Sequence, residues 1–293
     1  MDYSVFKRAA RGCIRNSRIS PQRISAVYAL ILSLLGLLPV IAELLLSEYY
    51  GIDDPMRALA AQPVWQAKRA LLFYFAGSLL ITILTSLLQF GYANYTLRLS
   101  RCDSASRHDL FRPLRHPLRI LGFILLLVVL VVAVVTGCLT LLTLLPASLF
   151  SSMLLLGMAA LAVWLFLAYR YVIYVYLDNP ALPFLEILTR ARLLTRGYRK
   201  TILRLDLSFL WYVLLLGVVP SILPFLLDVL QDTSGASPVS FPVSLLLTAA
   251  NYLIANVLLQ RQFLPYVETS SACCYNALCD ISSGQTSLPS GAF

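Results

Sequence analysis

Long apolar runs alternate with shorter polar stretches along the whole chain. A helix that crosses the roughly 30 Å hydrocarbon core of a bilayer needs about 20 mostly apolar residues, because no water is present there to bond its backbone groups. Six runs meet this requirement, so the pattern predicts six membrane-spanning helices. They lie near residues 24–46, 70–90, 120–145, 150–168, 205–227 and 241–259.

The linkers between these runs predict how the helices pair. Only Pro146, Ala147 and Ser148 separate the third run from the fourth, so these two spans must be antiparallel neighbours. The remaining linkers divide the spans into three hairpins. We therefore predict an all-α polytopic membrane protein with one six-helix transmembrane domain over residues 1–280 and a disordered tail over residues 281–293.

The composition supports this interpretation. Apolar residues make up 59% of the chain and charged residues 13%, and the mean hydropathy is +0.79. A soluble domain carries about 25% charged residues. The chain therefore lacks the polar surface that a water-soluble globular protein needs.

Charge predicts the orientation of the chain in the membrane. Of the 23 Lys and Arg residues, 20 lie on the side of the predicted spans that carries both termini. Positively charged short loops stay in the cytoplasm, so we expect a multi-pass protein of the bacterial plasma membrane with both termini cytoplasmic. The same charges predict anionic lipid headgroups as partners. No aromatic and basic module is present to bind nucleic acid.

One cytoplasmic segment, from Phe184 to Leu205, combines charge with helical periodicity. Its apolar residues share one stripe, which predicts an amphipathic helix lying in the interface plane with that stripe in the acyl boundary. Gly197 is expected to end the helix before span five. The segment is either a topological anchor or a lipid- or partner-docking surface. The predicted anionic-lipid contacts are Arg190, Arg192, Arg196, Arg199, Lys200 and Arg204.

Polar residues and prolines inside spans are a second class of candidate site. Asn251 and Asn256 lie deepest in the sixth span, where they either form hydrogen bonds between helices or contact a substrate. Pro220 and Pro224 predict a bend in the fifth span, either as a hinge or as a local distortion. A transport path would run beside these positions.

Catalytic, cofactor and metal motifs are missing from the sequence. There is no metalloprotease, serine hydrolase, P-loop or dinucleotide-binding pattern. Cys273, Cys274 and Cys279 lack metal-ligand spacing and a nearby histidine, and five of the six cysteines fall on the reducing side, where disulfides are not expected. The sequence therefore predicts a protein that is not an enzyme and carries no cofactor.

Three segments carry a family resemblance. The first runs from Asp178 to Tyr212 and contains an Asp-Asn-Pro motif, a Gly-basic turn and an Asp-Leu-Ser-Phe motif. The others are residues 89–101 with His-Asp-Leu-Phe at 108–111, and residues 264–278. Together they resemble an uncharacterised bacterial integral-membrane family known as domain of unknown function 975. That family is distantly similar to the membrane part of some glycerophosphodiester phosphodiesterases.

The resemblance implies a six-helix plasma-membrane protein of unassigned function, connected with lipid or envelope handling. It transfers no catalytic residues. Physically, Asp178 or Asn179 is expected to cap the amphipathic helix, because Pro180 disfavours a helical Asn179. Asp206 is expected to form ion pairs with neighbouring cations of its own segment, which are Arg199, Lys200 and Arg204.

The leading functional hypothesis is a non-enzymatic membrane protein that handles or senses lipid or amphiphile through its basic cytoplasmic face. A secondary transporter or channel, with a path beside Asn251, is the first alternative. A membrane scaffold or assembly subunit is the second. The sequence leaves the substrate, the protein partner and any homo-oligomer open.

Overall fold

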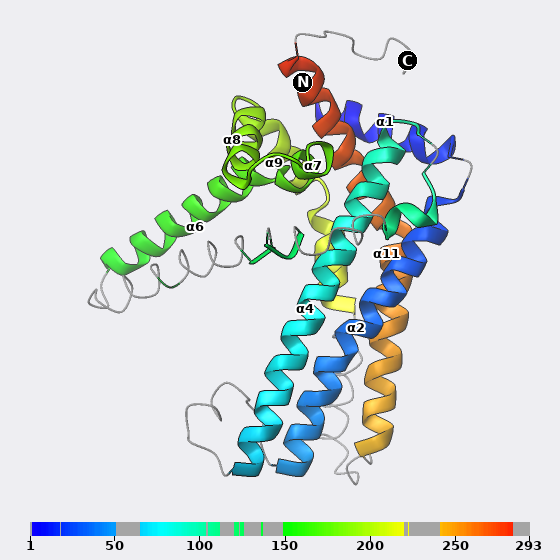
Figure 1. Ribbon diagram of the computed structural model, residues 1–293, viewed down its shortest axis with the longest axis vertical. Helices are drawn as coiled ribbons and strands as arrows, with labels where there is room; N and C mark the ends of the chain where they lie inside the picture. Colours follow the sequence, from blue (N-terminus) through cyan, green and yellow to red (C-terminus); the bar gives the residue numbers. More distant parts are fainter. Residues whose placement is uncertain are drawn as a thin grey trace. The chain divides into compact units, whose positions relative to one another are not determined.

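The computed structural model describes residues 2–17, 19–50, 65–103, 105–111, 149–219 and 241–283, a few positions between 120 and 136, and residue 222. All regular structure in these residues is helical, as predicted (Figure 1). The labelled helices are α1 (Tyr3–Arg15), α2 (Pro21–Tyr50), α4 (Trp65–Ser100), the 3-10 helix η1 (Arg107–Leu110), α6 (Leu149–Tyr169), α7 (Val172–Asp178), α8 (Phe184–Thr195), α9 (Arg199–Leu207) and α11 (Phe241–Ser282).

Four segments of the described residues are long and apolar enough to cross a membrane. They are Pro21–Glu43, Lys68–Ser100, Ala160–Asp178 and Arg199–Val219. These segments overlap the first, second, fourth and fifth predicted spans and fit a multi-pass membrane protein.

The other predictions for the spans differ in outcome. Most of the third predicted span lies outside the described residues, as do Pro220, Pro224 and the turn at 146–148. The sixth falls inside α11, which does not end near residue 259 but continues through Pro265 to Ser282. Of the predicted tail, only residues 281–283 are described, and the first two of them are helical.

The chain forms two compact units, each assembled from segments far apart in sequence. Unit 2 comprises residues 19–89 and 209–265. In it, α2 packs on α4 through the buried Leu46 and Leu71. It also packs on α11, because the Cβ of an alanine at Gly36 would lie 2.9 Å from the Tyr252 hydroxyl.

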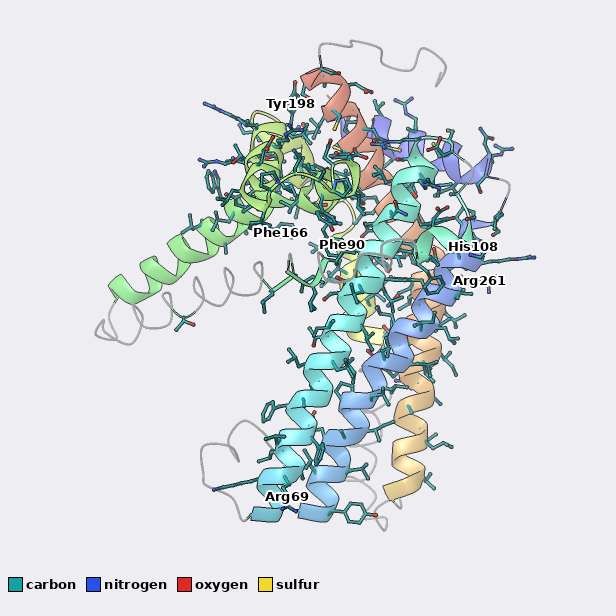
Figure 2. All side chains as sticks on the ribbon, viewed as in Figure 1. Arg69, Phe90, His108, Phe166, Tyr198 and Arg261 are labelled. Atoms are coloured by element: carbon teal, nitrogen blue, oxygen red, sulfur yellow. The ribbon has the colours of Figure 1, made fainter. Side chains whose placement is uncertain are left out.

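Unit 1 comprises residues 1–18, 90–208 and 266–293, and it contains the predicted amphipathic segment. That segment is not one helix but two, α8 and α9, separated by a turn at Arg196–Tyr198 (Figures 1 and 2). Gly197 has φ +89°, a left-handed conformation that glycine adopts without strain. Gly197 therefore interrupts the segment, as predicted, but the helix resumes at Arg199.

The apolar stripe of α8 also has a different environment from the one expected. Ile187 and Ala191 are fully buried, and α8 packs against α6 and α7. The part of the stripe at Ile187 and Ala191 therefore faces protein. Sequence periodicity identifies the buried face of a helix but not the material that covers it.

Unit 1 also contains the contacts that hold the chain segment following α4. A capping box between Ser106 and Asp109 caps the N-terminus of the 3-10 helix η1. Arg98 forms an ion pair with Asp109 at 2.7 Å, and the Asn94 amide donates to the Asp109 carbonyl at 3.0 Å. Gly91 lets the backbone of η1 approach α4 closely, because a Cβ there would overlap the Leu110 carbonyl oxygen and lie 2.8 Å from its carbonyl carbon.

This close approach generates the first prediction. Gly91→Ala should destabilise the protein by roughly 2–3 kcal/mol, because the obstacle is backbone and cannot rotate away. Thermal unfolding of the full chain in detergent measures the effect. Gly77→Ala in the same helix is the control, since its Cβ would meet nothing within 4 Å, and it should be neutral or slightly stabilising. Equal melting temperatures for the two variants would contradict the packing of η1 on α4.

Candidate anionic-headgroup site

A groove of about 690 Å³ lies in unit 1 where α6, α8 and α9 meet. Its position follows from the turn at Gly197, which brings the end of α8 and the start of α9 to the same side of α6. The residues that line it are Trp164, Thr189, Arg192, Leu193, Arg196, Gly197, Arg199 and Lys200.

The groove is strongly cationic. Four of the eight lining residues are Arg or Lys, and none of these eight is acidic. Four like charges around one concave surface repel each other, and an anion placed among them relieves that repulsion. Arginine guanidinium groups also match the geometry of phosphate oxygens. The groove is therefore suited to a phosphate or phosphodiester group.

Trp164 forms the aromatic part of the lining. The guanidinium group of Arg199 lies over its ring at 4.3 Å from the centroid, and that of Arg192 at 5.9 Å. The Nε atom of Arg199 is buried and has no hydrogen-bond partner in the part of the chain that the structure describes. Stacking holds Arg199 in place while leaving donor groups for a ligand.

Four of the six predicted lipid contacts line this groove: Arg192, Arg196, Arg199 and Lys200. The other two do not. Arg190 donates to Glu186 of its own helix at 2.8 Å. Arg204 is exposed on α9 and is not part of the lining. The structure therefore divides the predicted set into four groove residues and two outside it.

A second cavity of about 450 Å³ adjoins α8 on the side of α7 and α11. Leu193 and Arg196 line both cavities. The second has a more apolar lining, with Val175, Leu194 and Leu278 among its residues and Tyr198, whose side chain appears in Figure 2, close to the α8–α9 turn. The second cavity also includes Arg190, so the two cavities share two residues and both carry cations.

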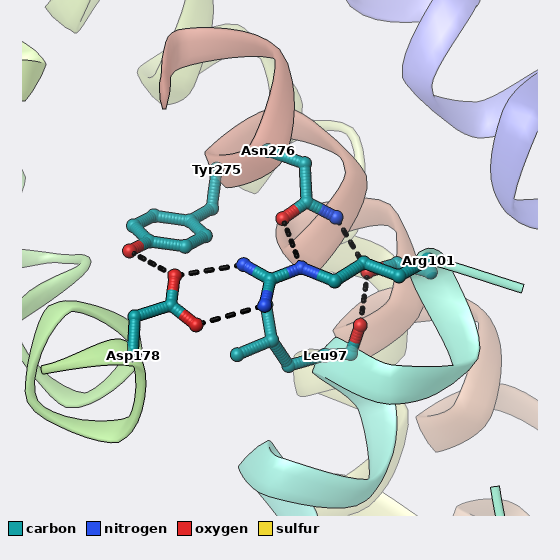
Figure 3. A network of polar contacts seen from close by, with 6 residues as sticks. Leu97, Arg101, Asp178, Tyr275 and Asn276 are labelled. Atoms are coloured by element: carbon teal, nitrogen blue, oxygen red, sulfur yellow. Dashed lines mark hydrogen bonds and ion pairs between the residues drawn. The ribbon is translucent and has the colours of Figure 1, made fainter. Parts of the chain in front are cut away.

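A polar network links three segments of unit 1 beside this second cavity (Figure 3). Arg101, just after α4, bonds both carboxylate oxygens of Asp178 at the end of α7, at 2.9 and 2.7 Å. Tyr275 of α11 donates to Asp178 at 2.8 Å, and the Asn276 amide accepts from Arg101 at 3.2 Å. The network therefore fixes the end of α7, from which the chain enters α8.

Two members of the network, Arg101 and Tyr275, have pKa values raised by their surroundings. The hydrogen bonds to Asp178 raise the pKa of Arg101 further above its ordinary value. Burial raises the pKa of Tyr275, so its hydroxyl stays protonated and continues to donate. The Tyr275 ring also stacks on that of Tyr174 at 5.4 Å. Aromatic packing and a hydrogen bond to Asp178 thus both hold the Tyr275 side chain.

Two predicted roles for acidic residues were wrong. Neither Asp178 nor Asn179 caps α8, whose N-cap is Pro183 without a side-chain hydrogen bond. Asp178 bonds Arg101 instead, which the sequence places 77 positions away. Asp206 pairs with Arg170 at 3.4 Å, not with the cations of its own segment. In both cases tertiary structure supplies a partner that local spacing could not identify.

Of the two intramembrane asparagines, Asn256 bonds within its own helix. The Asn256 amide donates to the Tyr252 carbonyl of its own helix at 2.9 Å, and Asn256 is buried. This bond lies within one helix, whereas a bond between helices was the expected form. Asn251 lies five residues earlier on α11.

Comparison of the chain with known protein-family models, curated proteins and solved structures found no match. Within the described part of the chain, no group of three or more His, Cys, Asp or Glu side chains is arranged to hold a metal ion.

The network generates the second prediction. Asp178→Asn should destabilise the protein by about 1 kcal/mol, because it removes one charge of a bidentate pair while Arg101 is only partly screened by water. Glu186→Gln is the control, since the Arg190–Glu186 pair is local and more exposed, and it should cost about 0.3 kcal/mol. Thermal unfolding of both variants in detergent compares them. An equal cost for the two would show that the network does not hold the segments together.

Proposed function

We propose that this chain is a non-enzymatic, multi-pass protein of the bacterial cytoplasmic membrane that binds anionic phospholipid headgroups in the groove of α6, α8 and α9. The observation that carries the proposal is the cluster of Arg192, Arg196, Arg199 and Lys200 around Trp164. A phosphodiester fits this lining by charge and by hydrogen-bond geometry.

The position of the groove along its helices favours a lipid over a soluble phosphate. Trp164 belongs to Ala160–Asp178, and Arg199 begins Arg199–Val219, both of which are candidate membrane spans. Trp side chains concentrate at the membrane–water boundary, where cations attract the anionic leaflet at about 1 kcal/mol each. Exposed Leu185 and Leu193 on α8 give the same region apolar surface for acyl chains.

The resemblance to the uncharacterised bacterial membrane family is part of the proposal. The three segments that carry it are in contact in unit 1. Arg101 ends the segment at 89–101, Asp178 begins the segment at 178–212, and Tyr275 belongs to the segment at 264–278. Their contacts give a physical reason for these residues to occur together. On this basis we propose that the chain is related to that family.

Lipid binding gives the third prediction. Arg199→Gln should weaken binding of a short-chain phosphatidylglycerol by about fivefold, because it removes one cation worth about 1 kcal/mol. Titration calorimetry on the detergent-purified full chain measures this. Arg204→Gln is the matched control, since it removes an exposed cation of the same helix outside the groove, and it should change binding by less than about twofold.

Two further ligands make the test specific. Phosphatidylcholine with the same acyl chains should bind more weakly than phosphatidylglycerol, and added salt should reduce the difference. Inorganic phosphate alone should bind more weakly than the lipid. Phosphate binding as tight as that of the lipid would overturn the lipid assignment. Equal losses of lipid affinity for Arg199→Gln and Arg204→Gln would show that the lipid is attracted by the charged surface as a whole and not by the groove.

A further inference from the structure

Three cysteine thiols from distant parts of the sequence meet in unit 1, away from the groove. Cys13 lies in α1, Cys102 directly after α4, and Cys273 in α11. The sulfur atoms of Cys13 and Cys102 are 3.7 Å apart. The Cys13 thiol also lies 3.8 Å from the Ser100 carbonyl oxygen. All three cysteines are free thiols and lie outside the candidate membrane spans.

The backbone at Cys102 is unusual. Its φ is +57°, and it is the one residue other than glycine with a positive φ in the described part of the chain. The Asp103 amide bonds back to the Arg98 carbonyl and the Cys102 amide to that of Leu99, which is a left-handed helix end. Glycine is the residue that fits this position without strain. Backbone preference therefore does not explain why position 102 is a cysteine. The position of its sulfur next to that of Cys13 does.

The two thiols differ in character. The hydrogen bond from Cys273 lowers the pKa of the Cys13 thiol to about 6, while burial acts in the opposite direction. Burial raises the pKa of Cys102. Cys13 is half-buried and Cys102 is exposed. Cys13 is thus the more acidic of the two thiols, and Cys102 is an accessible thiol within reach of it.

We propose that Cys13 and Cys102 form a reversible disulfide in response to peroxide, which makes this pair a redox modification site. The Cys13 thiolate attacks one oxygen of hydrogen peroxide; an S–O bond forms, the O–O bond breaks, and hydroxide leaves as water after taking a proton. Cys102 then attacks the sulfenic sulfur of Cys13. An S–S bond forms, the S–O bond breaks, and the second hydroxide leaves as water with the Cys102 proton. Two thiols are oxidised and one peroxide is reduced to two waters.

The disulfide would join α1 to the end of α4 and close a loop between positions 89 residues apart. Cellular thiols return such a bond to its reduced form, so a cytoplasmic location is compatible with a transient disulfide. Cys273 acts as a positioning residue, because it donates to Cys13 and stabilises the attacking thiolate.

Peptide mapping tests the proposal. The full chain in detergent is treated with hydrogen peroxide, alkylated and digested with trypsin without reduction. The expected product links residues 12–15 to residues 102–107, at least about tenfold above any other cysteine pair, and disappears with dithiothreitol. It should be absent from Cys13→Ser and Cys102→Gly. Cys279→Ser, outside the cluster, should leave it unchanged.

Further variants distinguish a loss of disulfide formation from a loss of the fold. Cys102→Gly should melt at or above the temperature of the reduced parent, because glycine fits the left-handed position, so loss of the product in this variant is not a loss of fold. Cys273→Ala should slow formation of the same product severalfold. A dominant Cys13–Cys273 product, products between chains only, or oxidation of Cys13 to sulfinic acid without a disulfide would each overturn the proposal.

Discussion

The bidentate pair between Arg101 and Asp178 is the contact on which the arrangement of unit 1 depends. It joins the end of α4 to the end of α7, and Tyr275 and Asn276 add the last turns of α11 to the same point. A guanidinium fork and a carboxylate fix relative orientation as well as distance. Since α8 follows Asp178 after only a short turn, the pair sets where the basic groove begins.

Charge in this protein acts in two opposite ways. Arg98, Arg101 and Arg170 are neutralised by carboxylates and hold helices together. The four cations of the groove are left without acidic lining residues, and their repulsion is tolerated because Arg199 and Arg192 stack on Trp164. A fold that pairs its structural cations with carboxylates, and stacks two of the groove cations on an aromatic ring, keeps positive charge available for an external anion.

The break at Gly197 couples secondary structure to the site. One continuous amphipathic helix would place its cations along a single exposed face. The left-handed glycine turns the chain, so that the last cations of α8 and the first of α9 surround a common space. The same device appears at Cys102, where a left-handed residue ends α4 and brings its thiol to Cys13. In both places a local backbone conformation assembles side chains from different helices.

The sequence by itself determined the helical class, four of the apolar spans, the interruption at Gly197 and the cationic segment that forms the groove. These are local properties, because hydropathy, periodicity and the conformational freedom of glycine depend on neighbours along the chain. Only the tertiary structure decided that Asp178 bonds Arg101, that Asp206 forms an ion pair with Arg170, and that Arg190 and Arg204 lie outside the groove. It also placed Cys13 beside Cys102. Each of these outcomes depends on helix packing that joins residues tens of positions apart, and no single stretch of sequence encodes such a distance.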